Sequence, residues 1–179
     1  MDLSHPEAWR ARAVELGADA ATVIDPSMIV TAEWVRMKCL YGCDDNGSYR
    51  TCPPNSPEPA YTRRLVDGFQ RAVLLRSGPH RGRQSSDARS RKLNDTALKL
   101  EGELFLAGFY KTWAMGAGPC DHCGTCELEG PCVAPERARP SVEGCGIDVF
   151  TTVRNAGWKI EVVRDEDDEY SFFALVLVD

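Results

Sequence analysis

The sequence predicts an α/β or α+β fold, with a single sheet covered by helices and two inserted cysteine-rich loops. Three observations support this prediction. Helical and strand-like patterns alternate along the 179 residues without internal repeats, as is typical of a sheet packed against helices. Two segments, about 39–59 and 118–136, interrupt the alternation and hold seven of the eight cysteines. The length suits one buried core, so we expect a single domain over residues 1–179.

The first third of the chain is predicted to alternate helix and strand. Residues 5–17 have helical spacing of apolar residues, with Ser4 as the expected N-cap. The stretch "AATVIDPSMIV" contains two short apolar runs separated by Asp25 and Pro26, which predicts two strands around a turn. Residues 39–59 follow as an ordered loop, because they are rich in Gly, Pro, Asn, Asp and Ser and have no sustained period.

The remaining elements follow the same alternation. Residues 59–69 are predicted to be a helix, "RAVLLR" a buried strand, and "SGPHRGRQSS" a mobile polar connection. Apolar residues recur at helical spacing over residues 87–109, which predicts the longest helix. "YKTWAMGAG" is a predicted strand that leads into the second cysteine-rich loop.

The C-terminal segment is predicted to contain one helix and two strands. "PSVEGCGIDVFTTVRNAG" has helical spacing, with Ser141 as the expected N-cap. "WKIEVV" and "YSFFALVLVD" are predicted strands, and the acidic run between them is expected to form their turn.

Composition excludes several classes of function. The net charge of -6 and the pI near 5.1 argue against binding of nucleic acid through phosphate neutralisation, so no nucleic-acid partner is expected. No window approaches the run of about 20 apolar residues that spans a bilayer, so no membrane association is expected. The N-terminus lacks a basic and apolar signal region, which predicts a cytoplasmic protein. In that reducing compartment, clustered cysteines indicate metal binding rather than disulfides.

The second loop has the spacing of an iron-sulfur ligand set. Its cysteines form the pattern C-x2-C-x2-C-x5-C, with thiols at Cys120, Cys123, Cys126 and Cys132. The [4Fe-4S] run of bacterial ferredoxins opens with the same C-x2-C-x2-C spacing. A structural zinc site uses pairs of C-x2-C turns separated by a longer spacer, and each turn supplies two ligands. A third cysteine at the same close spacing is not required by such a site. The spacing therefore favours an iron-sulfur cluster, with zinc as the alternative.

The first loop holds a second set of three thiols, Cys39, Cys43 and Cys52, in the pattern C-x3-C-x8-C. Cys52 precedes a proline, as does the last cysteine of the ferredoxin run, which ligates the other cluster in two-cluster ferredoxins. A crossover ligand such as Cys132 is therefore one way to complete this site. The chain is expected to hold one or two [4Fe-4S] clusters.

The eighth cysteine, Cys145, has two interpretations. On the predicted helix it is in register with Val142, Val149 and Val153, which indicates a small buried residue. Alternatively, it is the fourth ligand of the first set. Four thiolates at each site favour electron transfer, whereas a three-thiolate site leaves an open iron for substrate chemistry.

Three functions follow from these ligand sets. The leading hypothesis is electron transfer to a redox partner protein or a small-molecule cofactor, which makes the chain an oxidoreductase-type component. The second is a structural zinc-binding module that organises an interaction surface. The third is an enzyme with an open-iron cluster, in which Arg81, Arg83 and their polar segment bind an anionic substrate. The chain contains no dinucleotide fingerprint, phosphate-binding loop or zinc-protease motif.

Several stretches together resemble a known family, the predicted metal-binding proteins with domain of unknown function 2284. They are "RMKCLYGC", "TCPPNSPEP", "ELFLAGFYKTWAMGAGPCDHCGTC", "PCVAPERARPSVEGCGIDVF" and the closing apolar strand. The resemblance spans nearly the whole chain. It implies metal binding by the seven loop cysteines, namely Cys39, Cys43, Cys52, Cys120, Cys123, Cys126 and Cys132.

Overall fold

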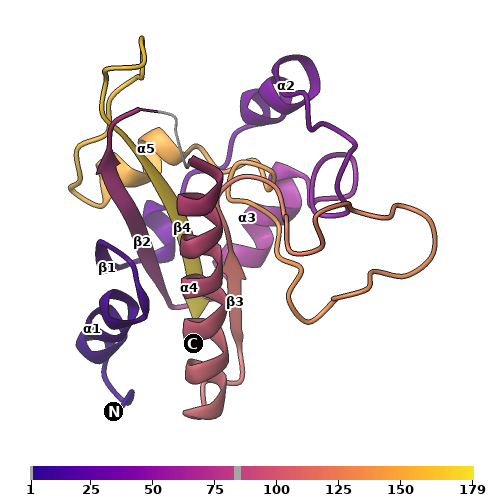
Figure 1. Cartoon of the computed structure of the whole chain (residues 1–179). Helices are drawn as coiled ribbons and strands as arrows, with labels where there is room; N and C mark the ends of the chain where they lie inside the picture. The colour runs from indigo at the N-terminus through magenta and orange to yellow at the C-terminus, as the bar shows by residue number, and fades with distance from the viewer. Residues whose placement is uncertain (1, 83–85) are drawn as a thin grey trace.

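The computed structural model describes residues 2–82 and 86–179 (Figure 1). In chain order, its elements are α1 (Pro6–Leu16), β1 (Ala20–Ile24), the 3-10 helix η1 (Pro26–Met28), α2 (Glu33–Gly42), α3 (Pro59–Asp67), β2 (Arg71–His80), α4 (Ser86–Leu106), β3 (Thr112–Met115), α5 (Val149–Asn155) and β4 (Tyr170–Val178). The strands form one sheet in the order β1-β2-β4-β3, and each neighbouring pair is antiparallel. Helices combined with an antiparallel sheet make this an α+β fold, one of the two classes expected.

The central strands are apolar on both faces because both faces of the sheet are covered. In β2, Val73 and Leu75 pack with residues of α1 and α4, whereas Ala72 and Leu74 pack with residues of α3 and α5. Successive side chains of a strand point to opposite faces. The unbroken apolar run of "RAVLLR" therefore belongs to a strand buried on both sides, as predicted.

The helix α4 covers one face of the sheet. Its buried residues Leu93, Ala97, Leu100 and Leu104 recur at helical spacing, and each is at most 1% exposed. Figure 1 shows α4 lying along the sheet, with the C-terminal strand β4 beside it. The predicted long helix is confirmed, although it ends at Leu106.

None of the helices in the described ranges combines the length and the apolarity needed to cross a membrane.

The predicted second strand in "AATVIDPSMIV" is wrong. After β1, Pro26–Met28 form the 3-10 helix η1. The Asp25 side chain accepts a hydrogen bond from the backbone N–H of Ser27 at 2.8 Å, and Pro26 has no N–H to leave unsatisfied. This local cap competes successfully with strand formation.

The predicted helix over residues 140–157 is wrong in its first half. The helix α5 begins only at Val149, and its N-cap is Asp148 rather than Ser141. Asp148 accepts hydrogen bonds from the backbone N–H and the hydroxyl of Thr151, at 3.0 and 2.6 Å. Residues 142–146 form turns instead, and Gly146 has a φ of +76°.

Other boundaries differ from the prediction for local reasons. "WKIEVV" is not a strand, since both edges of β4 are already paired, with β2 and β3. The N-cap of α1 is His5, and no side chain caps this helix, so Ser4 is not the predicted cap. β2 extends to His80, so the first half of "SGPHRGRQSS" belongs to the sheet. The rest includes residues 83–85, which lie outside the described residues.

The helix α2 was not predicted, and it changes the interpretation of the first cysteine-rich loop. It extends to Gly42, so Cys39 lies on a helix and only the residues beyond Gly42 form a loop. Val35 is its one buried residue, whereas Trp34, Met37 and Leu40 are about half exposed. A helix with so little buried apolar surface gives a weak periodic signal.

Replacing Asp148 tests the cap assignment. Asp148→Ala is expected to lower the free energy of unfolding by about 1 kcal/mol, because the N-terminus of α5 loses its side-chain acceptor. Urea denaturation measures this loss. Ser4→Ala serves as the control and is expected to have little effect, because Ser4 caps no helix. Equal losses for the two variants would contradict the assignment.

Candidate metal centre

The four cysteines of the second loop line one small cavity. Cys120, Cys123, Cys126 and Cys132 share its wall with residues 49–51 of the first loop. The strand β3 leads the chain into this segment, which projects from the sheet as a long loop in Figure 1. The C-x2-C-x2-C-x5-C set thus lines one cavity, and the first loop lies against it.

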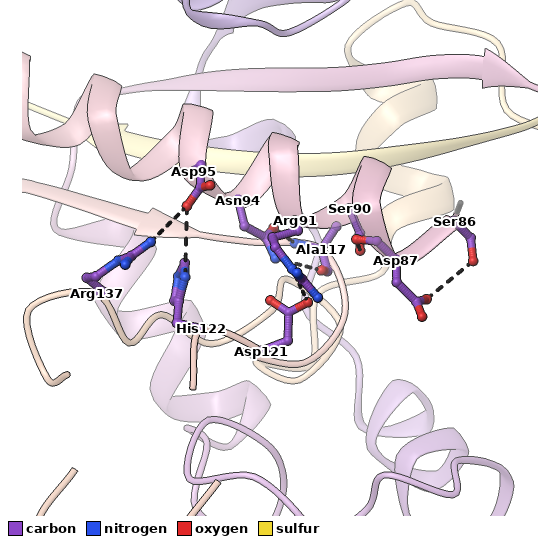
Figure 2. A network of polar contacts seen from close by, with 10 residues as sticks. All are labelled: Ser86, Asp87, Ser90, Arg91, Asn94, Asp95, Ala117, Asp121, His122 and Arg137. Atoms are coloured by element: carbon purple, nitrogen blue, oxygen red, sulfur yellow. Dashed lines mark hydrogen bonds and ion pairs between the residues drawn. The ribbon is translucent and has the colours of Figure 1, made fainter. Parts of the chain in front are cut away.

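Polar side chains of α4 hold the start of the second loop. Asn94 makes two hydrogen bonds with Ala117: its Oδ1 accepts from the backbone N–H at 2.7 Å, and its Nδ2 donates to the carbonyl at 3.1 Å. Gly116 allows this close approach, since a Cβ there would lie 2.5 Å from Asn94 Oδ1. Figure 2 shows Asn94 and its helix neighbours pointing toward the loop.

The same helix also contacts Asp121 and His122 of the loop, and Arg137 just after it. Arg91 Nε donates to Asp121 Oδ2 at 2.8 Å. Asp95 Oδ1 lies 3.4 Å from Arg137 Nη2 and 3.9 Å from His122 Nδ1 (Figure 2). The His122 side chain is only 8% exposed. These contacts place His122 against α4.

A buried ion pair holds the end of the loop. Arg139 donates to both carboxylate oxygens of Glu101, at 2.9 and 2.7 Å. Glu101 Oε2 also accepts from the backbone N–H of Ala114 in β3 at 2.8 Å. The Arg139 guanidinium lies 4.6 Å from the centre of the Trp113 ring. One carboxylate therefore joins the strand that enters the loop to the segment that leaves it.

Arg50 connects the two loops. Its backbone N–H donates to Cys126 Sγ at 3.4 Å. Its guanidinium donates to the carbonyl oxygens of Glu127, at 2.6 Å, and of Gly130. The backbone of Arg50 therefore contacts a predicted ligand directly. The sequence analysis missed Arg50, although its position between Cys43 and Cys52 placed it in the first loop.

The first set of thiols lies next to the second. Cys39 is in the last turn of α2, Cys43 follows the helix, and both line a second, larger cavity. Burial, together with the nearby acidic groups of Cys43, Asp45, Cys39 and Cys120, raises the pKa of Cys52 to about 12.

Burial also raises the pKa of two other partly buried thiols, Cys39 and Cys120. It raises the pKa of Cys39, with a further contribution from Cys43. It raises the pKa of Cys120 as well, against the opposite effect of the backbone N–H groups of His122 and Arg139. Metal ligation requires the thiolate, so binding at these residues must displace protons.

Cys145 lies in the apolar core rather than on a helix. It is 1% exposed and packs in the cluster that includes Ile29, Val66 and Leu175. Burial raises the pKa of its thiol to about 12. These surroundings support the interpretation of Cys145 as a small buried residue, and its role as a ligand stays a prediction.

Arg81, one of the two residues expected to bind an anionic substrate, lines neither the small cavity of the second loop nor the larger cavity beside Cys39 and Cys43. Arg81 is 70% exposed at its side chain and lies 3.1 Å from Glu169 Oε1. Arg83 is outside the described residues. All eight cysteines lie within the described ranges, and none forms a disulfide. In the same ranges, no three His, Cys, Asp or Glu side chains are grouped closely enough to hold a metal ion.

Comparison with known proteins finds one family. The family described as predicted metal-binding protein (DUF2284) matches residues 22–178. No curated protein and no solved structure matches the chain.

Replacing Gly116 tests the attachment of the second loop to α4. In Gly116→Ala the new methyl group would overlap Asn94 Oδ1, so we expect a loss of about 1–3 kcal/mol in the free energy of unfolding, measured with urea. Gly102→Ala is the matched control, because a Cβ at this position of α4 contacts nothing within 4 Å. It is expected to stabilise the helix slightly. A neutral Gly116→Ala variant would contradict this role for Asn94.

Proposed function

Because this chain belongs to the DUF2284 family of predicted metal-binding proteins, we propose that it holds a [4Fe-4S] cluster on Cys120, Cys123, Cys126 and Cys132. We propose further that it transfers electrons to a redox partner protein or a small-molecule cofactor. One observation carries the proposal: these four thiols share the wall of a single cavity. The spacing of the first three is that of an iron-sulfur protein.

The donor set of this cavity fits such a cluster. Four soft thiolate ligands are the usual set for a cubane, which supplies one-electron transfer when bound. Arg50 provides a backbone N–H donor to Cys126 Sγ, a type of contact that tunes the potential of iron-sulfur sites. Cys123 is exposed, and the other three cysteines are partly exposed. This position near the surface favours electron exchange with a partner.

Cys132 is proposed as the ligand that completes the second set. It lines the cavity with the other three cysteines of its loop. In this proposal, Cys132 therefore does not serve as a ligand of the first set. Cys39, Cys43 and Cys52 remain as the three thiols of a separate site. Because Cys52 and Cys120 lie close enough to interact electrostatically, two clusters would be neighbours.

Anaerobic reconstitution tests this proposal. After incubation with iron and sulfide, the protein is expected to bind about four irons and four sulfides per cluster, with visible charge-transfer absorbance and an EPR signal on reduction. Cys123→Ser combined with Cys126→Ser is expected to remove the cluster of the second loop. A matched control is Cys145→Ala, which leaves that loop intact. Stoichiometric zinc without acid-labile sulfide in the anaerobically purified protein would decide for a structural zinc-binding module instead.

A second candidate function is an enzyme with an open-iron cluster acting on an anionic substrate. The observation that favours it is the location of the first thiol set. Cys39 and Cys43 line a cavity of about 710 Å³, whereas Cys145, the candidate fourth ligand, packs in the apolar core. Three thiolates beside a cavity of this size would leave one iron open to a substrate.

Cys145→Ala tests the second candidate. If Cys145 is a core residue, the variant is expected to keep the iron and sulfide content of the reconstituted protein and to lose about 1 kcal/mol of stability. Cys39→Ser is the comparison and is expected to lose the cluster of the first set. Loss of that cluster in a folded Cys145→Ala protein, judged by circular dichroism, would make Cys145 the fourth ligand.

A further inference from the structure

The larger cavity has features of a small-molecule site that electron transfer does not require. It lies between α2, the adjoining ends of β2 and β4, and residues 159–163. Its volume of about 710 Å³ falls in the range of 300–1,000 Å³ typical of ligand pockets. Cys39 and Cys43 form part of its wall, so a ligand bound there would lie beside the first thiol set.

Much of the wall is apolar and aromatic. It includes Trp34 from α2, Phe150 from α5 and Phe173 from β4, together with Ile160 and Val163. Trp34 and Val163 remain 47% and 44% exposed. Large apolar side chains that gather at a cavity while remaining accessible are typical of a site that binds organic molecules.

Two cations of the wall lack an acidic partner. Among the described residues, neither Arg76 of β2 nor Lys38 of α2 forms an ion pair, and Arg76 Nε is buried without a hydrogen-bond partner. The Arg76 guanidinium lies 5.2 Å from the centre of the Trp158 ring. A buried donor without a partner costs free energy, which a bound acceptor would recover.

Three of the four carboxylates of the wall have polar partners. Asp148 caps α5, Glu161 lies 3.8 Å from Lys159, and Glu169 lies 3.1 Å from Arg81. The fourth is Glu143, which is partly exposed as a residue but has a buried Oε2 atom without a hydrogen-bond partner. In the part of the chain that the structure describes, none of the four carboxylates forms an ion pair with Arg76 or Lys38, so these two cations are available to a bound anion.

We propose that this cavity binds a small organic anion with an aromatic body. Arg76 holds the negative group, Lys38 adds positive charge from α2, and the aromatic body packs against Trp34 and Phe173. The proposal deepens the second candidate function by naming the substrate class of that site. It replaces Arg81 and Arg83 with Arg76 and Lys38 as the residues that recognise the anion.

A pair of fluorescent probes with the same rings tests the proposal. The anionic probe is 8-anilinonaphthalene-1-sulfonate, and the neutral probe is N-phenyl-1-naphthylamine. We expect Arg76→Met to weaken binding of the anionic probe about tenfold, the effect of losing a charge-assisted hydrogen bond. Binding of the neutral probe is expected to change less than about twofold, because the aromatic wall is intact.

Further variants separate recognition from folding. Lys38 is exposed on α2, so the Lys38→Met protein is expected to fold normally. Its affinity for the anionic probe is expected to fall by about threefold, while its affinity for the neutral probe stays unchanged. Arg76→Lys is expected to restore part of the affinity lost in Arg76→Met. The matched control is Lys99→Met, which removes an exposed lysine of α4 away from the cavity. Equal losses for both probes, or an equal loss in the control, would overturn the proposal.

The same titrations distinguish this proposal from the proposed function. They are made on full-length protein purified without oxygen, whose iron, sulfide and zinc contents are measured. Charge-dependent binding to protein that takes up no iron would support the anion site and contradict the cluster. A protein that holds its cluster but binds both probes equally well in wild type and Arg76→Met would contradict the anion site alone.

Discussion

The cysteine-rich region depends on one largely buried ion pair, between Glu101 of α4 and Arg139, whose side chains are 12% and 17% exposed. Glu101 also accepts a hydrogen bond from the backbone N–H of Ala114, so one carboxylate joins the helix, the strand before the second loop and the segment after it. Removing one partner would leave the other charge unpaired in a largely buried position, which is unfavourable. The loop has little apolar sequence of its own, so this pair supplies the attachment that a hydrophobic core would otherwise provide.

The two faces of the helix α4 contact different parts of the molecule. Its apolar face, with Leu93 and Leu100 among its residues, covers the sheet. Its polar face, with Asn94 and Asp95, holds the second loop (Figure 2). The packing that stabilises the fold therefore also positions the loop, and Arg50 then joins the first loop to the second. The two proposed sites have different surroundings, since one lines a small cavity between the loops, whereas Cys39 and Cys43 line the larger cavity that also contains Arg76 and Lys38.

Much of the fold was predictable because its signals are local. The apolar run of β2 and the helical spacing of α4 depend on burial patterns that repeat along the chain. The secondary-structure predictions were wrong where a single capping side chain determined which element forms. Asp25 caps η1 in place of a strand, and Asp148 caps α5 seven residues after Ser141, the expected N-cap. Such a cap favours a different local structure from the one that the apolar periodicity predicts. Which of the two forms depends on the tertiary packing around the segment.

The sequence by itself determined the ligand chemistry: which residues are thiols, how they are spaced, and their membership of a metal-binding family. Only the tertiary structure decided which thiols lie together, because that depends on contacts between distant residues. In the structure, Cys132 lines one small cavity with the other three cysteines of its loop, and Cys145 is buried in the core. The tertiary structure also brought Arg76 and Lys38 to one cavity from different elements. Spacing encodes what a short loop can ligate, whereas burial and electrostatic environment arise only when the sheet, helices and loops are packed together.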